Sequence, residues 1–85
     1  MEEDWDAYGF VRSSNHRKDI VIALSNSPKI PSEIADNLGM RMPHVSKSLK
    51  DLCERDIAKC HNPDKRKGKV YDLTEKGVWV AQNID

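Results

Sequence analysis

The chain has 85 residues and a formal net charge of zero, with 38% apolar and 33% charged side chains. This length suits one domain with a single hydrophobic core, and the charged fraction excludes the fibrous and membrane-embedded classes of protein. The longest apolar run, residues 20–24, is far shorter than the roughly 20 residues that cross a bilayer. We therefore expect no membrane partner. A cytoplasmic location is expected because the acidic start, MEEDWD, resembles neither a secretory signal nor a transit peptide.

The first predicted helix covers residues 13–25, because the Ser and Asn residues at its start can cap it. Its apolar residues Ile20, Val21 and Leu24 lie on one helical face, as expected for a helix that packs against a core. The sequence NSPK at residues 26–29 predicts a turn, so the helix is expected to end there.

Two further helices are predicted close together. The stretch PSEIADNLG, residues 31–39, places Pro31 at a first helical position and Gly39 just past the helix end. A third helix, residues 43–55, follows after a very short turn. Its apolar residues recur with helical spacing on one face: Val45, Leu49, Leu52 and Cys53. Two short helices joined across a glycine turn are typical of a helix-turn-helix.

The apolar period then changes from that of a helix to that of a strand. IAKCH at residues 57–61 and VYDL at residues 70–73 predict the two strands of a hairpin. The segment between them, NPDKRKGK at residues 62–69, is a loop by composition, and Gly68 allows it to turn tightly.

A final helix is expected after Thr74, which can cap it. Its core-facing residues are expected to be Val78, Trp79 and Ala81. Gly77 lies within its first turns and should weaken it by roughly 1 kcal/mol relative to Ala.

The zero net charge conceals an uneven distribution. Residues 1–10 contain four acids and no base, whereas residues 41–70 contain nine bases against four acids, a net charge of +5. Such a basic third can bind a polyanion even when the whole chain is neutral, because association responds to the local field. The alternative is that these charges only solvate a surface.

Three blocks of sequence, in this order and at this spacing, resemble a known family: PSEIADNLG (31–39), HVSKSLKDL (44–52) and KGKVYDLTEKG (67–77). The chain resembles the small winged helix-turn-helix DNA-binding proteins and looks closest to short archaeal regulators of the MarR/ArsR type. This resemblance implies an α+β, mostly α fold with three helices, a two-stranded β-hairpin wing and a C-terminal helix. Residues 13–85 would form the winged helix domain, preceded by an acidic and aromatic extension at residues 1–12.

Three positions depart from the family pattern. Ile30 and Arg41 stand where relatives carry a Ser or Thr helix cap, and each missing cap costs about 1 kcal/mol. Asp56 stands where relatives tend to carry a glycine before the first strand. We therefore expect an altered turn between the third helix and the hairpin.

The resemblance implies that helix 43–55 enters the DNA major groove and that the wing loop, residues 62–69, lies on the backbone or in the minor groove. Helical geometry places Lys47 opposite the buried face of this helix. Pro43 is tolerated because the first turn has no hydrogen bond to lose there. Arg41, at the cap position, is suited to a DNA phosphate beside the helix N-terminus.

We expect His44 and Lys47 to contact base edges, and Ser46 and Lys50 to contact phosphates. Asp51 either limits the depth of contact or pairs with Lys47 at i, i+4. In the loop, Arg66 is suited to a narrow minor groove. The predicted DNA-contacting residues are Arg41, Pro43, His44, Ser46, Lys47, Lys50, Lys65, Arg66, Lys67 and Lys69.

The aromatic residues near the N-terminus allow two interpretations. They either cover the core of one protomer or form a homodimer interface with the last helix, and we favour the interface. The predicted interface residues are Trp5, Tyr8, Phe10 and Trp79. A dimer would set two recognition helices about one DNA turn apart and so imply a pseudo-palindromic site.

Other kinds of chemistry have less support. Cys53, Cys60 and His61, with His16 or His44 as a fourth ligand, lack the paired spacing of zinc sites, so we expect no metal or other cofactor. No catalytic triad and no phosphate-binding glycine loop is present, so we expect no enzyme activity. Little room is expected for a small-molecule effector. The alternative function is a winged-helix adaptor that binds protein, which the basic exposed face disfavours.

Overall fold

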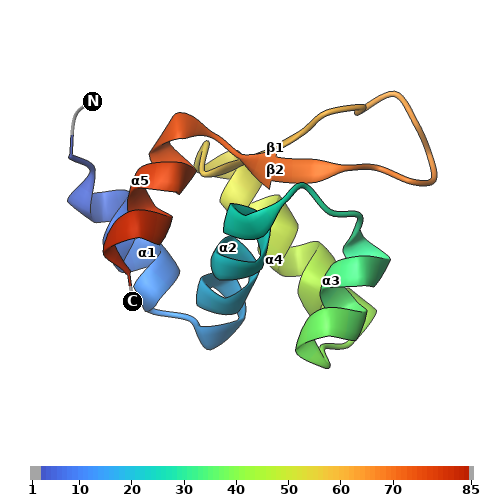
Figure 1. Ribbon diagram of the computed structural model, residues 1–85, viewed down its shortest axis with the longest axis horizontal. Helices are drawn as coiled ribbons and strands as arrows, with labels where there is room; N and C mark the ends of the chain where they lie inside the picture. The colour runs from blue at the N-terminus through green and yellow to red at the C-terminus, as the bar shows by residue number, and fades with distance from the viewer. Residues whose placement is uncertain (1–2, 85) are drawn as a thin grey trace.

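The computed structural model describes residues 3–84, which form five helices and a two-stranded antiparallel hairpin (Figure 1). The elements in chain order are α1 (Trp5–Arg12), α2 (Asn15–Asn26), α3 (Pro31–Leu38), α4 (Met42–Glu54), β1 (Ala58–Cys60), β2 (Tyr71–Leu73) and α5 (Glu75–Asn83). The predicted fold class, mostly helical with a hairpin wing, is confirmed. None of the helices in residues 3–84 has the length and hydropathy of a membrane-spanning segment.

Helix α2 lies at the centre of the molecule and contacts the other four helices and β2. Its residues Ile20 and Val21 are fully buried, and Leu24 is nearly so. Helices α1 and α5 pack against each other on one side of α2, while α3 and α4 pack on the other (Figure 1). The hairpin runs along one edge of this assembly, and its loop extends past α3 (Figure 1). One core therefore joins all the elements.

Helix α1 lies in the segment that was predicted as an extension, where no helix was expected. It begins at Asp4, whose carboxylate accepts a hydrogen bond from the Ala7 N–H at 2.9 Å. That bond lowers the pKa of Asp4, and the nearby Lys76 ammonium, 3.3 Å away, lowers it further. Ala7 and Val11 are buried in the common core. The helix thus packs as part of the domain.

Helix α5 is present as predicted, and Thr74 caps it by accepting from the Gly77 N–H at 3.1 Å. Its predicted burial face is partly wrong, because Val78 is 42% exposed whereas Val80 is fully buried. Gly77 sets this orientation: a Cβ there would overlap the carbonyl oxygen of Ile57. The helix turns its glycine toward the hairpin, and this puts Val78 outside the core. Trp79 and Ala81 are partly buried against the core, as expected.

The turn between α4 and β1 is strained at Asp56, which has a φ of +61°. A left-handed conformation costs a residue with a side chain roughly 1–2 kcal/mol, although Asp tolerates it better than most. The turn is closed by the Ile57 N–H, which donates to the Leu52 carbonyl at 2.9 Å. Asp56 thus adopts the left-handed conformation that a glycine would adopt more easily at this position.

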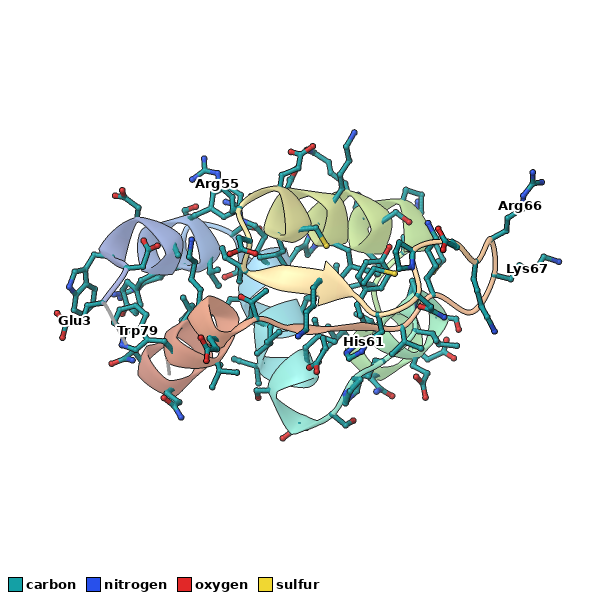
Figure 2. All side chains as sticks on the ribbon, turned by 90° about the horizontal axis from the view of Figure 1, so that it is seen from above. Glu3, Arg55, His61, Arg66, Lys67 and Trp79 are labelled. Carbon is teal, nitrogen blue, oxygen red and sulfur yellow. The ribbon has the colours of Figure 1, made fainter. Side chains whose placement is uncertain are left out.

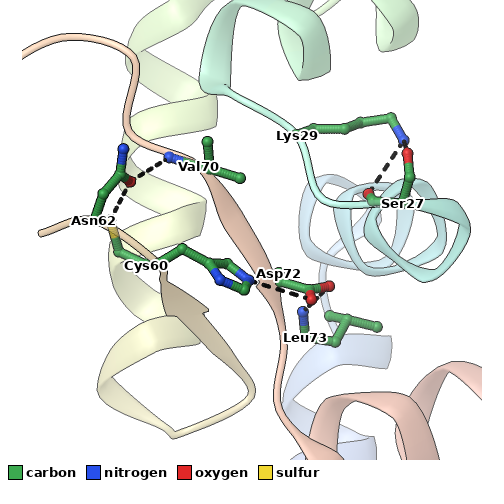
Figure 3. A network of polar contacts seen from close by, with 8 residues as sticks. Ser27, Lys29, Cys60, Asn62, Val70, Asp72 and Leu73 are labelled. Carbon is green, nitrogen blue, oxygen red and sulfur yellow. Dashed lines mark hydrogen bonds and ion pairs between the residues drawn. The ribbon is translucent and has the colours of Figure 1, made fainter.

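The hairpin is short, and a third segment extends it. Strands β1 and β2 pair with Ala58 opposite Leu73 and Cys60 opposite Tyr71. Lys29, in the turn before α3, exchanges two backbone hydrogen bonds with Tyr71, at 3.0 and 2.8 Å. The Lys29 ammonium also donates to the hydroxyl of Ser27 at 2.9 Å (Figure 3). It donates to the carbonyl of Ala23 as well, at 3.0 Å. The wing is thereby joined to the end of α2.

Candidate nucleic-acid interface

The exposed face of α4 carries the polar residues predicted for it. The helix buries Val45, Ser48, Leu49 and Leu52, and Cys53 packs partly buried against the core. The exposed predicted contact residues on or beside it are Arg41, Pro43, His44, Ser46, Lys47 and Lys50. Lys47 is 77% exposed and pairs with Asp51 at 3.2 Å, which confirms the predicted i, i+4 ion pair. A cationic face free of core contacts is thus available on α4.

The N-terminus of α4 offers an anion little besides Arg41. Arg41 occupies the cap position in an extended conformation, and its side chain makes no capping hydrogen bond within residues 3–84. The N–H groups of His44 and Val45 both donate to its carbonyl, at 3.0 and 3.1 Å, and Pro43 has no N–H. The guanidinium, rather than a row of free N–H groups, therefore supplies most of the attraction for a phosphate here.

His44 contacts His16, a pairing that the sequence did not predict. Its ring stacks on the ring of His16, with centroids 4.9 Å apart and planes inclined by 28°. His16 lies in the first turn of α2, 28 positions earlier in the chain, and both residues are exposed. The stack fixes the orientation of the His44 ring at the surface of α4. Only the packing of α2 on α4 reveals this pair.

The wing loop is held at its base by Asn62. The Asn62 side-chain oxygen accepts from the Val70 N–H at 2.8 Å, and its amide donates to the Gly68 carbonyl at 3.0 Å. Gly68 has a φ of +71°, which fulfils its predicted role in the turn. Beyond this closed base, Arg66 and Lys67 point away from the body of the protein (Figure 2). Lys65 is also exposed, whereas Lys69 is partly buried.

The wing loop and the start of α4 border the same hollow, of about 270 Å³. Met42 lines it from α4, and Arg66, Lys67 and Lys69 line it from the loop. The fold therefore brings the two basic segments, far apart in the sequence, to one side of the molecule.

The aromatic residues predicted as a dimer interface divide into two groups. Trp5 packs edge-on against Tyr8 and Trp79, with centroid distances of 5.3 and 5.1 Å, and remains 56% exposed. Phe10 lies apart from them, between the guanidinium groups of Arg17 and Arg55, at 3.9 and 4.2 Å. These contacts lie within one chain. The exposed aromatic cluster is therefore Trp5, Tyr8 and Trp79.

The cysteines and histidines do not gather into a metal site in the part of the chain that the structure describes. Cys53 and Cys60 are free thiols. His61 lies 3.4 Å from Asp72 across the hairpin. His16 and His44 form their own pair. Among residues 3–84, no group of three or more His, Cys, Asp or Glu side chains could hold a metal ion.

Residues 20–77 match the family described as the winged helix DNA-binding domain. The chain belongs to this family. No curated protein matches the sequence. Among solved structures, ZitR of Lactococcus lactis in complex with DNA is 29% identical, with a TM-score of 0.70, over 79% of this chain and 47% of its own.

Two other solved structures are similar. A double mutant of the same ZitR is 27% identical, with a TM-score of 0.73, over 81% of this chain and 48% of its own. The adhesin competence repressor AdcR of Streptococcus pyogenes is 21% identical, with a TM-score of 0.74, over 81% of this chain and 52% of its own. At that identity AdcR shows the fold alone. This winged helix chain spans about half the length of the structures it matches.

Proposed function

We propose that the protein regulates transcription by binding specific sites in double-stranded DNA, with α4 as the recognition helix in the major groove. The wing loop, residues 62–69, would lie on the backbone or in the adjacent minor groove. The observation that carries this proposal is the hollow that Met42, at the start of α4, and the basic residues of the wing loop line together. The ZitR structure in complex with DNA supports it, since that protein is similar over most of this chain. A regulator of the MarR or ArsR type fits the three sequence blocks best.

Each side chain on α4 has a role that follows from its position. His44 and Lys47 lie on the exposed face and would read base edges, with His16 holding the His44 ring in place. Ser46 and Lys50 would contact phosphates. Lys47 must exchange its ion pair with Asp51 for a contact with DNA, and an exposed pair of this kind costs little to break.

The wing would contribute mainly electrostatic attraction. Lys65, Arg66 and Lys67 project from a loop that Asn62 closes at its base, so they can reach a second stretch of backbone. Arg66 is suited to a narrow minor groove, where the negative potential is enhanced. Lys69, which lines the hollow and is partly buried, would contact a phosphate between the wing and α4.

We also propose that two copies associate through the aromatic cluster Trp5, Tyr8 and Trp79. Trp5 leaves more than half of its surface exposed although it packs on both other rings, and an exposed Trp of this kind is typical of an interface. Phe10 would contribute less, because guanidinium groups already cover its ring. Light scattering at tens of micromolar should give the mass of a dimer, and a monomer mass would contradict this part of the proposal.

The test of DNA binding is fluorescence anisotropy with mixed duplexes over a series of salt concentrations. If a dimer neutralises roughly six to eight phosphates, log K should fall with log[salt] at a slope of about −5 to −7. Lys47→Ala and Arg66→Ala should each weaken binding. Lys76→Ala is the matched control, because this lysine pairs with Asp4 on the opposite side of the molecule.

The outcomes separate DNA binding from the alternative function. A slope shallower than about −2, or equal effects of all three variants, would contradict the electrostatic contact described above. A protein-binding adaptor, which the exposed apolar side chain of Met42 would serve, requires that no duplex binds even at about 50 mM salt.

A further inference from the structure

A cavity of about 430 Å³ lies between α4, the hairpin and the start of α3. This volume falls within the range of roughly 300–1,000 Å³ that is typical of pockets for small molecules. From the sequence, little room is expected for such a pocket, because the apolar residues are needed for the core. Leu49 and Pro31 line the cavity with apolar surface, and Cys53, Cys60 and Tyr71 add two thiols and a phenol ring.

The lining has no net charge near neutral pH. Burial raises the pKa of the Cys53 thiol, and the neighbouring Cys60 raises it further. Burial also raises the pKa of the Tyr71 hydroxyl, as do the thiols of Cys60 and Cys53. Both groups therefore stay protonated at pH 7. The charged lining residues Lys50 and Glu54 carry opposite signs. A charged molecule would lose hydration in this cavity without gaining an unopposed partner.

The cavity touches both elements that are proposed to contact DNA. Leu49 and Lys50 belong to α4. The Cys60 thiol donates to the side-chain oxygen of Asn62 at 3.6 Å, the same atom that accepts from the Val70 N–H and closes the base of the wing loop (Figure 3). A molecule that moves the Cys60 thiol would therefore act on the geometry of the wing.

We propose that this cavity binds a small, uncharged, largely apolar molecule, which packs against Leu49, Cys53, Cys60 and Tyr71. Polarisable thiols and an aromatic ring favour such a ligand through dispersion. Binding is independent of the function proposed above. The effect of the ligand on DNA affinity, through α4 and the wing, rests on that function.

The first test uses N-phenyl-1-naphthylamine, an uncharged fluorescent probe of apolar sites, with the full chain and no DNA. The wild type should enhance its emission in a saturable way. Cys53→Phe places a ring in the cavity and should weaken the affinity about tenfold or more. Val78→Ala, which removes an exposed apolar side chain from α5 outside the cavity, should leave it unchanged. Equal binding to Cys53→Phe and the wild type, or loss of binding in Val78→Ala, would overturn the proposal.

A second measurement needs no substitution and stands even if Cys53→Phe fails to fold. Cys53 and Cys60 are alkylated with N-ethylmaleimide, and the rate at each thiol is followed by mass spectrometry. Saturating probe should slow alkylation of both thiols severalfold, because it covers them. Unchanged rates at both thiols would place the probe elsewhere and overturn the proposal.

The third measurement separates the cavity from its effect on DNA. Saturating probe is added to the anisotropy titration, and a severalfold change in the Kd for DNA supports the coupling. An unchanged Kd would overturn the coupling alone. Failure of the wild type to bind any duplex would contradict the proposed function, while the probe results would still decide on the cavity.

Discussion

The two sides of the molecule begin their helices differently. Helices α1, α2 and α5, which lie away from the proposed DNA side, begin at Asp4, Ser14 and Thr74, whose side chains all accept a capping hydrogen bond. On the proposed DNA side, α3 and α4 begin at Ile30 and Arg41, and neither side chain caps its helix within residues 3–84. A cap is worth about 1 kcal/mol. The two helices on the proposed DNA side therefore lack a stabilising contact that the other three helices have.

Helix α3 partly compensates for its missing cap. The Glu33 carboxylate accepts from the Ile30 N–H at 3.0 Å, which is half of a capping box. Helix α4 has no such substitute among the described residues, and Arg41 adds a positive charge beside the positive end of the helix dipole. The N-terminus of α4 is thus the less stabilised of the two helix starts.

The largest change in stability is expected for a substitution at Gly77 in α5, one of the helices with a side-chain cap. Gly77→Ala should destabilise the protein by about 2–3 kcal/mol, because the added Cβ overlaps the Ile57 carbonyl. Helix propensity alone predicts the opposite sign, a gain of roughly 1 kcal/mol. Urea denaturation of the variant and the wild type measures the difference. A more stable variant would show that α5 can move away from the hairpin at little cost.

The next effect tests the comparison directly, by giving α4 the cap that it lacks. Arg41→Ser should stabilise the free protein by up to about 1 kcal/mol, because the hydroxyl can accept from the His44 N–H, which here donates only to the backbone carbonyl of residue 41. The same change should weaken DNA binding, since it removes the guanidinium. Thermal unfolding and anisotropy on one protein sample measure both. Arg41→Lys, which keeps the charge, is the control for the binding arm.

If Arg41→Ser gains stability and keeps its DNA affinity, the missing cap has no connection with DNA. If the stability of Arg41→Ser equals that of the wild type, the start of α4 loses nothing by having Arg41 in place of a side-chain cap.

A smaller gain is expected at the turn that joins the two sides. Asp56→Gly removes a side chain from a residue with a φ of +61°, and it should stabilise the protein by about 0.5–1 kcal/mol in spite of the greater freedom of glycine in the unfolded chain. Urea denaturation measures this, with Asp56→Ala as the control that keeps the strain and should give no gain. Equal stability of both variants would mean that the turn relaxes freely.

The smallest expected effect is a loss of folding stability at alkaline pH. The pKa of Cys53 is raised in the folded state, so an unfolded thiol, which ionises near pH 9.0, releases its proton first as the pH rises. Above that pH the unfolded state binds fewer protons, and stability therefore falls. Urea denaturation at pH 8 and pH 10 should show a smaller loss for Cys53→Ser than for the wild type. Equal losses would assign the decline to other groups, including Tyr71, whose pKa is raised as well.

Most of the fold could be predicted from the sequence, because α2, α3, α4 and the hairpin carry the apolar period or the turn residues of their class. Helix α1 could not, since only Ala7 and Val11 of its eight residues are buried, too few to show a period. Val78 was assigned to the wrong face because α5 is short and its orientation depends on Gly77 meeting the hairpin. Both the packing of α1 on the core and the approach of Gly77 to the hairpin join segments that are far apart in the sequence, so local sequence does not indicate them.

The same distinction applies to the candidate site. The positions of the basic residues on α4 and the wing follow from helical geometry and loop composition, and the Lys47–Asp51 pair follows from their spacing. His16 and Asn62 act across elements, and nothing in their neighbours along the chain indicates it. The 430 Å³ cavity depends on how α4 and the hairpin meet, so no sequence pattern could have predicted it.

The pairing of Lys29 with Tyr71 fixes where the wing lies relative to α4. Strands of three residues each are marginal alone, and a hairpin joined to the body only at its ends would swing. The two backbone bonds between Lys29 and Tyr71 prevent this. The distance between the exposed face of α4 and the base of the wing is therefore fixed. Substitutions at the tip of the loop can change which phosphates the wing reaches, but they leave this distance unchanged.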